Sequence, residues 1–414
     1  MTDPNAAVEH FDAAVVGAGP AGIATGLALA HVGATVALAG PPPPKVPAAR
    51  PETRTAALLT SSVDFLKRLN VWDALAPHAA PLKAIRIVDA SRSLLRSQDI
   101  IFEAQELGLD AFGYNIANTT LSEALYARAQ EVVARLAPET IKTICIDDHA
   151  ARLTLGDGTS LSVRLVAGAD GRNSVCREAA GIKTDQTRYD QAAIASSFHH
   201  ALPHDGVSTE IHREGGSVTS VPTPDPLVSS LIWVGGTAEI EALMACDDEG
   251  FTAKLQERIG DILGNISGPG PRESFPVIGL TAKLLAANRT ALVGEAAHIL
   301  PPIGAQGLNL GLRDAAALAD CVADARRHGR DPGGRAVLAS YIRARQLDVM
   351  SRTLGVDILN RSLLTGLLPV QAARGAVLAG LNAFAPLRRL AMRAGLTPPA
   401  SLPSLMRLLS RLPS

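Results

Sequence analysis

The sequence has few cysteines, and none of them is spaced as a metal ligand. Cys145, Cys176, Cys246 and Cys321 lie far apart and form no CxxC motif, so we expect no metal site. The first residues, MTDPNAAVEHFD, carry no basic region followed by an apolar core, and we expect neither a secretory signal nor a transit peptide. Both absences predict a protein of the reducing cytoplasm.

The sequence also lacks an excess of either charge. Lysine and arginine number 39 against 40 aspartates and glutamates, a net charge of -1, which provides no overall attraction to nucleic acid. With 47% hydrophobic and 19% charged residues, the composition is that of a globular protein. The 414 residues exceed the roughly 150 of an average domain, so we expect several domains or one large discontinuous architecture.

Residues 13–44 contain no charged side chain, and about 18 apolar residues in a row suffice to suggest a membrane span. Glycines and a proline interrupt this stretch, however. They divide it into an apolar strand, a glycine turn, an alanine- and leucine-rich helix and a second strand. This order predicts a βαβ unit instead of a membrane helix.

The rest of the chain alternates between strand-like and helix-like patterns. We expect a proline-rich loop at 41–51, helices at 61–69 and 119–136, a hairpin at 153–163, a buried strand at 164–168, a separate sheet across 192–234 with helices up to 263, and a strand at 290–293 before a long helix. The last strand and helix resume the pattern of the first domain, which is therefore predicted to be discontinuous.

The glycine turn reads GAGPAG, with Gly17, Gly19 and Gly22 between the first strand and the first helix. Glycines at these places permit a tight turn, close approach of a pyrophosphate to the backbone and close packing of the helix on the strand. The pattern predicts a dinucleotide site, and the alternative is a glycine-rich turn without a ligand.

The acidic residue that usually binds the adenosine ribose is missing. It should end the second strand about 20 residues after the turn, where the sequence has Ala39 and Gly40. The ribose then needs a contact from backbone, water or another side chain, and Glu52 and Arg54 are candidates.

Two later segments carry further glycine turns. GADGRNSVCR at 168–177 follows a buried strand, and its alternative interpretation is a turn that caps a helix. GEAAH at 294–298 and PPIGAQGLN at 301–309 precede the long helix. Free amides at the start of that helix can stabilise an anionic ring such as a reduced flavin. For this segment the alternative is a proline- and glycine-rich loop.

GAGPAG, GADGRNS and GEAAHILPPIGAQGLNLGLRD, in this order and at these separations, resemble the three motifs of FAD-dependent aromatic hydroxylases, the group A flavoprotein monooxygenases. The last segment and the chain length resemble the ubiquinone-biosynthesis hydroxylases in particular. The resemblance covers roughly residues 10–350. It implies an α/β fold with a Rossmann-like FAD-binding domain of the para-hydroxybenzoate hydroxylase type, an inserted β-sheet substrate domain and a helical C-terminal region.

We place the domain boundaries accordingly. The FAD-binding domain is expected at 1–80, 98–182 and 275–340, the substrate domain at 81–97 and 183–274, and the C-terminal region at 341–414. The resemblance implies hydroxylation of the ring of a polyprenylated phenol in ubiquinone biosynthesis. FAD is the implied cofactor, O2 the co-substrate, and NAD(P)H or an external electron donor the reductant.

The resemblance also assigns residues to the FAD site. The matched positions are Gly17, Gly19, Ala21, Gly22, Arg54, Asp170, Gly171, Glu295, Pro302, Gly304, Gly307, Leu308 and Asn309. The first glycines would approach the pyrophosphate, and the amides of Leu308 and Asn309 would receive the charge of the reduced flavin. Glu295 stands where the family has an aspartate that reaches the ribityl hydroxyls. No side chain is matched to a catalytic acid or base, and His298 is expected to be structural.

Beyond Tyr341 the sequence has ten arginines but only the acids Asp348 and Asp357, among apolar runs too short to span a membrane. One interpretation is a solvated helical edge or a dimer contact. The other is a surface that meets anionic lipid or a partner, such as a ubiquinone-biosynthesis complex. A nearly water-insoluble prenylated substrate is consistent with peripheral contact at the inner membrane.

Other functions remain as alternatives: a hydroxylase of another aromatic, a prenyl reductase, or a non-catalytic scaffold that has lost tight FAD binding. Trp72 and Trp233 are the only tryptophans, which excludes the WxWxIP signature of flavin halogenases. The sequence has no CxxxxC pair and no second glycine fingerprint after a strand, which argues against a disulfide reductase.

Overall fold

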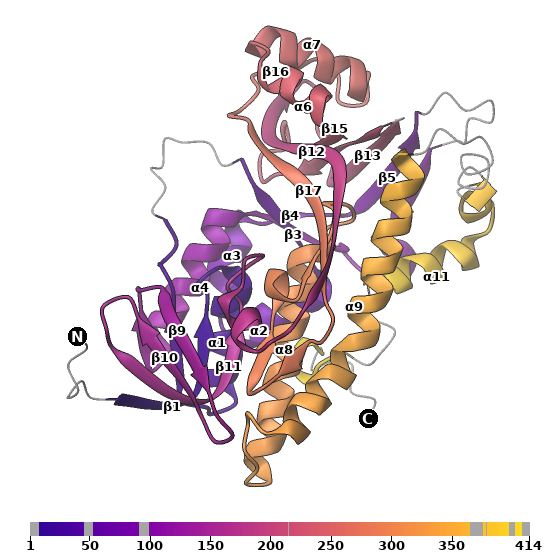
Figure 1. The fold of residues 1–414 in the computed structure, drawn as a ribbon. Helices are drawn as coiled ribbons and strands as arrows, with labels where there is room; N and C mark the ends of the chain where they lie inside the picture. Colours follow the sequence, from indigo (N-terminus) through magenta and orange to yellow (C-terminus); the bar gives the residue numbers. More distant parts are fainter. Residues whose placement is uncertain are drawn as a thin grey trace.

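The computed structural model describes residues 8–44, 53–90, 99–213, 215–364, 376–377, 379–396 and 402–407. They form two large sheets and one small sheet (Figure 1). In the view of Figure 1 the first sheet lies at the lower left and the second sheet extends from it toward the top. One long helix, which begins at residue 335, runs beside both.

The first sheet is mostly parallel and contains the βαβ unit. Its strands are β1 (Val8–Val16), β2 (Val36–Ala39), β8 (Arg135–Ala137), β9 (Ile141–Ile146), β10 (Ala151–Leu155), β11 (Ser160–Gly168), β18 (Ala286–Ala287) and β19 (Thr290–Leu292). They follow the order β18-β19-β11-β1-β2-β8, and β10 and β9 extend from β11 as antiparallel strands. β1 therefore has a parallel neighbour on each side, β2 and β11.

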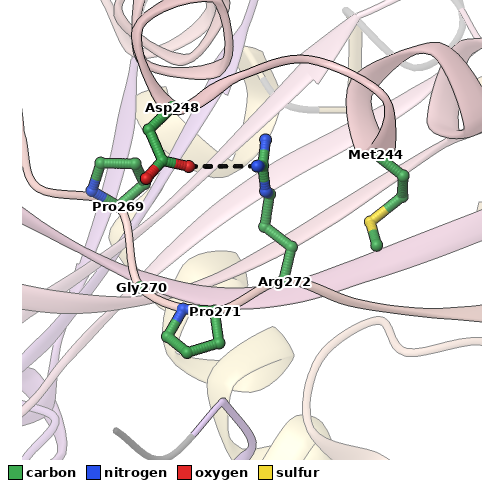
Figure 2. A pocket seen from close by; sticks show the side chains of 6 residues that line it. All are labelled: Met244, Asp248, Pro269, Gly270, Pro271 and Arg272. Atoms are coloured by element: carbon green, nitrogen blue, oxygen red, sulfur yellow. Dashed lines mark hydrogen bonds and ion pairs between the residues drawn. The ribbon is translucent and has the colours of Figure 1, made fainter.

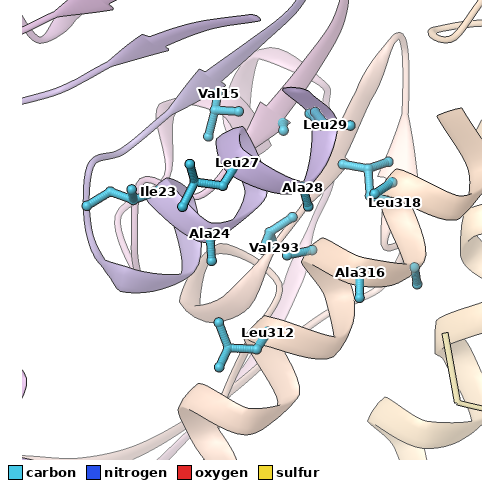
Figure 3. Packing of buried hydrophobic residues seen from close by; sticks show 14 of the residues in the cluster. Val15, Ile23, Ala24, Leu27, Ala28, Leu29, Val293, Leu312, Ala316 and Leu318 are labelled. Atoms are coloured by element: carbon cyan, nitrogen blue, oxygen red, sulfur yellow. The ribbon is translucent and has the colours of Figure 1, made fainter. Parts of the chain in front are cut away.

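Helices cover this sheet because their alanines and leucines permit close packing. Those around the sheet are α1 (Pro20–His31), α4 (Asn118–Val132), α5 (Val175–Ala179), α8 (Gln306–Arg327) and α9 (Arg335–Leu364). α1 and α8 lie against each other, and Figure 3 shows Leu27 and Ala28 of α1 in one cluster with Ala316 and Leu318 of α8. The two helices thereby hold the first and the third expected motifs close together.

The second sheet is long and strongly curved. Its strands are β5 (Ala84–Asp89), β6 (Ile100–Glu103), β12 (Thr184–His200), β13 (Val207–Arg213), β14 (Gly216–Pro222), β15 (Val228–Gly236), β16 (Ile266–Ser267), β17 (Glu273–Ala282) and β20 (His298–Ile299). Helices α6 (Thr237–Met244) and α7 (Asp248–Ile259) cover one face with an apolar cluster that includes Trp233 and Phe251. A smaller apolar cluster, including Ala193 and Val234, lies on the opposite face.

The remaining elements connect the two large sheets. A three-stranded sheet contains β3 (Thr55–Leu59), β4 (Ala80–Pro81) and β7 (Gly113–Ala117), and the short helices beside it are α2 (Thr60–Arg68), α3 (Trp72–Leu75), η1 (Ala76–His78) and η2 (Ala104–Leu107). η3 (Gly294–Ala296) leads from β19 toward α8, while α11 (Ala385–Leu396) and η4 (Ser404–Met406) belong to the C-terminal region.

Most expected elements are confirmed, with two corrections. The helix expected at 119–136 ends at Val132, because Arg135–Ala137 instead pairs with β2 as strand β8. The strand expected at 164–168 is no separate element but the second half of β11. Part of the expected proline-rich loop, 45–52, lies outside the described residues. β6, which we assigned to the FAD-binding domain, pairs with β5 in the second sheet; the domain boundaries stay a prediction.

Candidate functional site

The carboxyl ends of four parallel strands form one row in the first sheet. Val16 pairs with Ala39 on one side and with Gly168 on the other, and Gly168 pairs with Leu292. The first motif follows directly after Val16, the second begins at Gly168 itself, and the third begins two residues after Leu292. Open α/β sheets bind ligands outside the carboxyl ends of their strands. The fold thus brings together three motifs that are far apart in the sequence.

The glycines of the first turn have two different surroundings. A Cβ on Gly17 would lie 2.2 Å from the carbonyl oxygen of Ala169, and a Cβ on Gly22 would lie 1.9 Å from that of Gly17. At Gly19, in contrast, a Cβ would meet nothing within 4 Å. Gly19 is the N-cap of α1, and no side chain caps that helix. Pro20 has no N–H, and the Ile23 amide donates to the Gly19 carbonyl at 2.9 Å. The amides of Ala21 and Gly22 are therefore open to an anion such as a pyrophosphate.

Ala21 serves the packing between motifs. Its methyl carbon is 3.3 Å from the place that a Cβ would take on Gly294 and also on Gly311. A larger side chain at any of these three positions would separate α1 from η3 and α8. Ala21 thus fixes the distance between the first motif and the third.

The side chain of Asp170 is engaged in a helix cap. One carboxylate oxygen accepts a hydrogen bond from the Ser174 hydroxyl at 2.5 Å, and the other accepts from the Cys176 amide at 3.1 Å. Ser174 in turn accepts from the Arg177 amide at 2.9 Å and so caps α5. These bonds match the alternative interpretation of the second motif. Gly171, in the same turn, has a left-handed φ of 77°.

Glu295 has an open position. It lies in η3 after Gly294, whose φ of 60° turns the chain at the end of β19. The Glu295 side chain is exposed. Within the described part of the chain its carboxylate makes no hydrogen bond or ion pair. It is free to accept hydrogen bonds from a ligand at the edge of the sheet.

The start of α8 is uncapped as well. Gly304 and Ala305 have left-handed φ values of 64° and 53°, and Ala305 is the N-cap, without a side-chain hydrogen bond to the helix. The helix ladder leaves the amides of Gln306, Gly307 and Leu308 unpaired, and the dipole of this 22-residue helix adds partial positive charge there. Gly304 and Gly307 are exposed and Pro302 is half-buried, so the loop can accept a ring against its backbone.

Asn309 has a structural side chain. Its Oδ1 accepts from the Leu59 amide at 2.8 Å and the Ser62 hydroxyl at 2.7 Å, and its Nδ2 donates to the carbonyls of Ala57 and Ala305, both at 2.7 Å. All four hydrogen-bonding positions of the amide are satisfied. Asn309 thereby ties the start of α8 to β3 and α2, a role that the motif alone did not predict.

Arg54 lies toward the second sheet. Its Nε is 3.2 Å from a carboxylate oxygen of Glu273, and its guanidinium stacks on the Phe275 ring with the central carbon 5.0 Å from the ring centroid. The other ribose candidate, Glu52, falls outside the described residues. The backbone at Gly40 explains why this position has no acidic side chain. Gly40 has φ 142°, and a Cβ there would lie 3.0 Å from the Ala18 amide nitrogen.

A pocket lies between the end of α6, the start of α7 and the segment before β17 (Figure 2). It is lined by Met244, Asp248, Pro269, Gly270, Pro271 and Arg272. The Arg272 guanidinium spans it and approaches the Asp248 carboxylate to 3.1 Å. None of the motif residues lines this pocket, so the edge of the first sheet remains the candidate site.

The sequence profile described as FAD binding domain matches residues 10–352. The chain belongs to this family. This match confirms the expected family and the expected cofactor, FAD. The three motifs all lie within the matched residues, and the geometry of the sheet edge, with open amides and a free carboxylate, fits a dinucleotide.

Two of the relatives of this chain are hydroxylases by name. The ubiquinone hydroxylase UbiL of Rhodospirillum rubrum is 34% identical over 385 residues, covering 92% of this chain and 88% of that protein. The 3-demethoxyubiquinol 3-hydroxylase of Escherichia coli is 30% identical and covers 92% of this chain and 97% of that protein. They confirm the expected enzyme class, an FAD-dependent hydroxylase.

Solved structures confirm the fold class. The p-nitrophenol 4-monooxygenase PnpA from Pseudomonas putida superimposes with a TM-score of 0.75 at 19% identity, covering 95% of this chain and 100% of that one. PqsL from Pseudomonas aeruginosa, in complex with 2-aminobenzoylacetate, gives a TM-score of 0.72 at 22% identity over 89% of this chain and 99% of that one. At these identities the likeness concerns the fold.

Proposed function

We propose that this protein hydroxylates the aromatic ring of a polyprenylated phenol in ubiquinone biosynthesis. The observation that carries the proposal is the 34% identity with a ubiquinone hydroxylase over 92% of the chain. When bound, FAD supplies the activation of O2 and the transfer of one oxygen atom to the ring, with electrons from NAD(P)H or another donor.

The residues of the sheet edge bind and orient the cofactor in this proposal. The open amides after Gly19 hold the pyrophosphate, and Glu295 accepts hydrogen bonds from the ribityl hydroxyls. The unpaired amides of Gly307 and Leu308 place positive charge where the reduced flavin is negative. Of the expected pair Leu308 and Asn309, the Asn309 amide falls within the hydrogen-bond ladder of α8. Asn309 keeps these amides in place through the hydrogen bonds of its side chain.

The substrate ring is proposed to bind between this edge and the inner face of the second sheet. Two hydrogen bonds hold the sheet against the FAD-binding part: Thr55 Oγ1 to Ser230 Oγ at 3.0 Å, and Asn115 Nδ2 to the Pro222 carbonyl at 2.9 Å. A third, from Asn360 Nδ2 to Gln191 Oε1 at 3.0 Å, holds it against α9. The apolar side chains of Ala193, Val234 and Val277 cluster on one face of the sheet. Such an apolar surface excludes water, and the exclusion of water protects reactive intermediates of the hydroxylation from side reactions.

Two measurements test the proposed function in sequence. The first is the visible absorption of the purified protein with and without added FAD, which should show flavin bands. The second is conversion of a short-chain prenylated phenol with NAD(P)H and O2, followed by mass spectrometry for a product heavier by one oxygen atom. A protein that stays colourless with added FAD would favour the scaffold alternative. A flavoprotein that hydroxylates only unprenylated phenols would favour another aromatic substrate.

We further propose that the C-terminal region contacts the membrane that holds such a substrate. Leu347, Met350, Leu354 and Ile358 are large, exposed and spaced along one face of α9. Among the described residues, no helix is long and apolar enough to cross a membrane. An apolar stripe within a segment rich in arginine is typical of a surface that meets anionic lipid. A ubiquinone-biosynthesis complex would be a second occupant of the same face.

Sedimentation with vesicles tests this contact. The protein should pellet with vesicles of phosphatidylcholine and phosphatidylglycerol more than with phosphatidylcholine alone. Leu354→Glu, at a position 60% exposed in the stripe, should reduce binding at least fivefold. Leu284→Glu, 51% exposed but outside the stripe, is the matched control and should bind normally. Equal loss in both variants, or no binding of the wild type, would contradict the membrane proposal.

A further inference from the structure

The turn that carries Glu295 is fixed on every side except at Glu295 itself. The Ala297 amide donates to the Gly294 carbonyl at 2.8 Å. The Arg177 guanidinium donates to the Ala296 carbonyl at 2.8 Å, and the Tyr341 hydroxyl donates to the Leu292 carbonyl at 2.6 Å. The backbone around Glu295 therefore has little freedom, while its carboxylate stays exposed.

Asp314 of α8 holds both ends of this turn with one oxygen. Its Oδ2 accepts a hydrogen bond from the Gly294 amide at 3.0 Å and lies 2.6 Å from His298 Nε2. The other ring nitrogen of His298 is buried and has no hydrogen-bond partner within the described residues. The orientation of the His298 ring thus depends on Asp314, and His298 marks the end of the turn.

The second oxygen of Asp314 faces the helix α9. Arg345 Nε donates to Asp314 Oδ1 at 2.7 Å, and Arg345 Nη1 donates to Asp348 Oδ2 at 2.8 Å. Arg313 Nη1 donates to the other oxygen of Asp348 at 3.1 Å. All four side chains are buried. Although burial alone would raise the pKa of the Asp314 carboxyl, the adjacent His298 and Arg345 hold it below its usual value.

Close packing leaves the turn no room to shift toward α8. A Cβ on Gly311, one turn before Asp314 in α8, would lie 3.2 Å from the Cα of Gly294. The backbone of the turn therefore lies directly on α8. This packing blocks movement of the turn toward α8, and the contacts of Asp314 with Gly294 and His298 hold the turn against movement away from the helix.

We propose that Asp314 is a positioning residue of the cofactor site, which sets the place of the Glu295 carboxylate through Gly294 and His298. It touches neither substrate nor FAD in this proposal. The inference rests on FAD binding by this family and does not depend on the identity of the phenol. It goes beyond the residues that motif matching assigns.

The test measures the Kd of FAD by titrating FAD with the apoprotein and following the quenching of flavin fluorescence. Asp314→Asn should raise this Kd at least tenfold, because the neutral amide cannot accept from Gly294, His298 and Arg345 as the carboxylate does. Asp348→Asn is the matched control: it is equally buried and shares Arg345, but its side chain makes no contact with the turn. Its Kd should stay within about threefold of the wild type.

A double-mutant cycle with Glu295→Gln separates positioning from general damage. If Asp314 acts through Glu295, the double variant should bind FAD no more than about twofold more weakly than Glu295→Gln alone. Fully additive losses would overturn the proposal. So would a folded Asp314→Asn with the wild-type Kd, or an Asp348→Asn that is impaired as much.

A second pair of variants applies if Asp314→Asn does not fold. His298→Gln keeps an N–H donor for Asp314, and His298→Leu removes it. The leucine variant should raise the Kd of FAD at least fivefold over the glutamine variant, and equal values would overturn the proposal. Because no phenol is present in these measurements, failure of this inference is distinguishable from failure of the proposed hydroxylation.

Discussion

The carbonyl oxygen of Gly17 lies 1.9 Å from the place that a Cβ on Gly22 would occupy. Between these residues, Gly19 has open space where its side chain would be. One turn therefore contains glycines that the fold requires and a glycine that packing within the described chain does not require. The two requirements can be separated by substitution.

Gly19→Val should abolish FAD binding without unfolding the protein. The backbone of Gly19 is extended, with φ -76° and ψ 171°, which valine adopts readily. Its side chain would occupy the space of the pyrophosphate. We expect the Kd of FAD to rise at least 100-fold, measured by fluorescence quenching, while the Tm of the apoprotein changes by only a few degrees. Normal flavin occupancy would contradict the assignment of the first motif.

Gly22→Ala is the contrasting variant. Its methyl group would collide with backbone rather than with a flexible side chain, so the turn has to distort. Overpacking of this kind costs about 1–3 kcal/mol, which should appear in urea denaturation of the apoprotein. If Gly22→Ala were as stable as the wild type, the tight approach of α1 to β1 would be wrong.

Glu295 should contribute to FAD affinity through its charge. A hydrogen bond to a charged group contributes about 1.5–3 kcal/mol, and about 1.4 kcal/mol corresponds to a tenfold change in Kd. We expect Glu295→Gln to raise the Kd of FAD at least tenfold. Glu295→Asp keeps the charge and is the control, with a Kd within about threefold of the wild type. Equal affinity of all three proteins would remove Glu295 from the site.

Asn309→Ala should destabilise the protein. The substitution removes this partner from the Leu59 amide, the Ser62 hydroxyl and two carbonyls. The Ser62 bond is buried and the other three are partly buried, and an unsatisfied buried group costs about 1–3 kcal/mol. We expect a loss of about 3 kcal/mol or more in urea denaturation. Gln306→Ala, which removes one hydrogen bond to the Gly304 carbonyl, should cost less than about 1.5 kcal/mol. Similar losses in both variants would contradict the structural role.

His200 should make the protein less stable in mild acid. Burial lowers the pKa of this histidine in the folded state, and its ring contacts the Leu202 carbonyl at 2.7 Å and the Ser229 hydroxyl at 2.9 Å. A depressed folded pKa means that the unfolded chain binds the proton first, so stability is lost as the pH falls below about 6.5. The Tm between pH 7.5 and 5 should fall more steeply in the wild type than in His200→Gln. If the Tm of both proteins fell equally with pH, His200 would not be the group responsible.

Much of the site could be predicted because its signals are local. The glycines around Gly19 stand between a strand and a helix, and the carboxyl ends of parallel strands must meet at one edge. The alternative interpretation of Asp170 as a cap was equally available from its spacing to Ser174. Such features need only neighbours within a few residues.

The relationships that the sequence did not reveal are long-range. Arg345 belongs to the stretch that we interpreted as a cationic, amphipathic tail, yet it is buried and paired with Asp314, 31 residues away. No periodicity indicates which of ten arginines turns inward, because the choice depends on where α9 crosses α8. The contact of Arg54 with Glu273 is hidden for the same reason, since Arg54 directly precedes β3 and Glu273 begins β17 in another sheet.

The row formed by Val16, Gly168 and Leu292 also has a consequence for biosynthesis of the chain. Its members emerge from the ribosome one after another, and at about 5–20 residues per second the interval from the first to the last is on the order of tens of seconds. Until β19 and α8 have emerged, the glycine turn exists without its third motif. Flavin capture must therefore wait for the last quarter of translation, and a nascent chain passes most of its synthesis as an incomplete apoprotein.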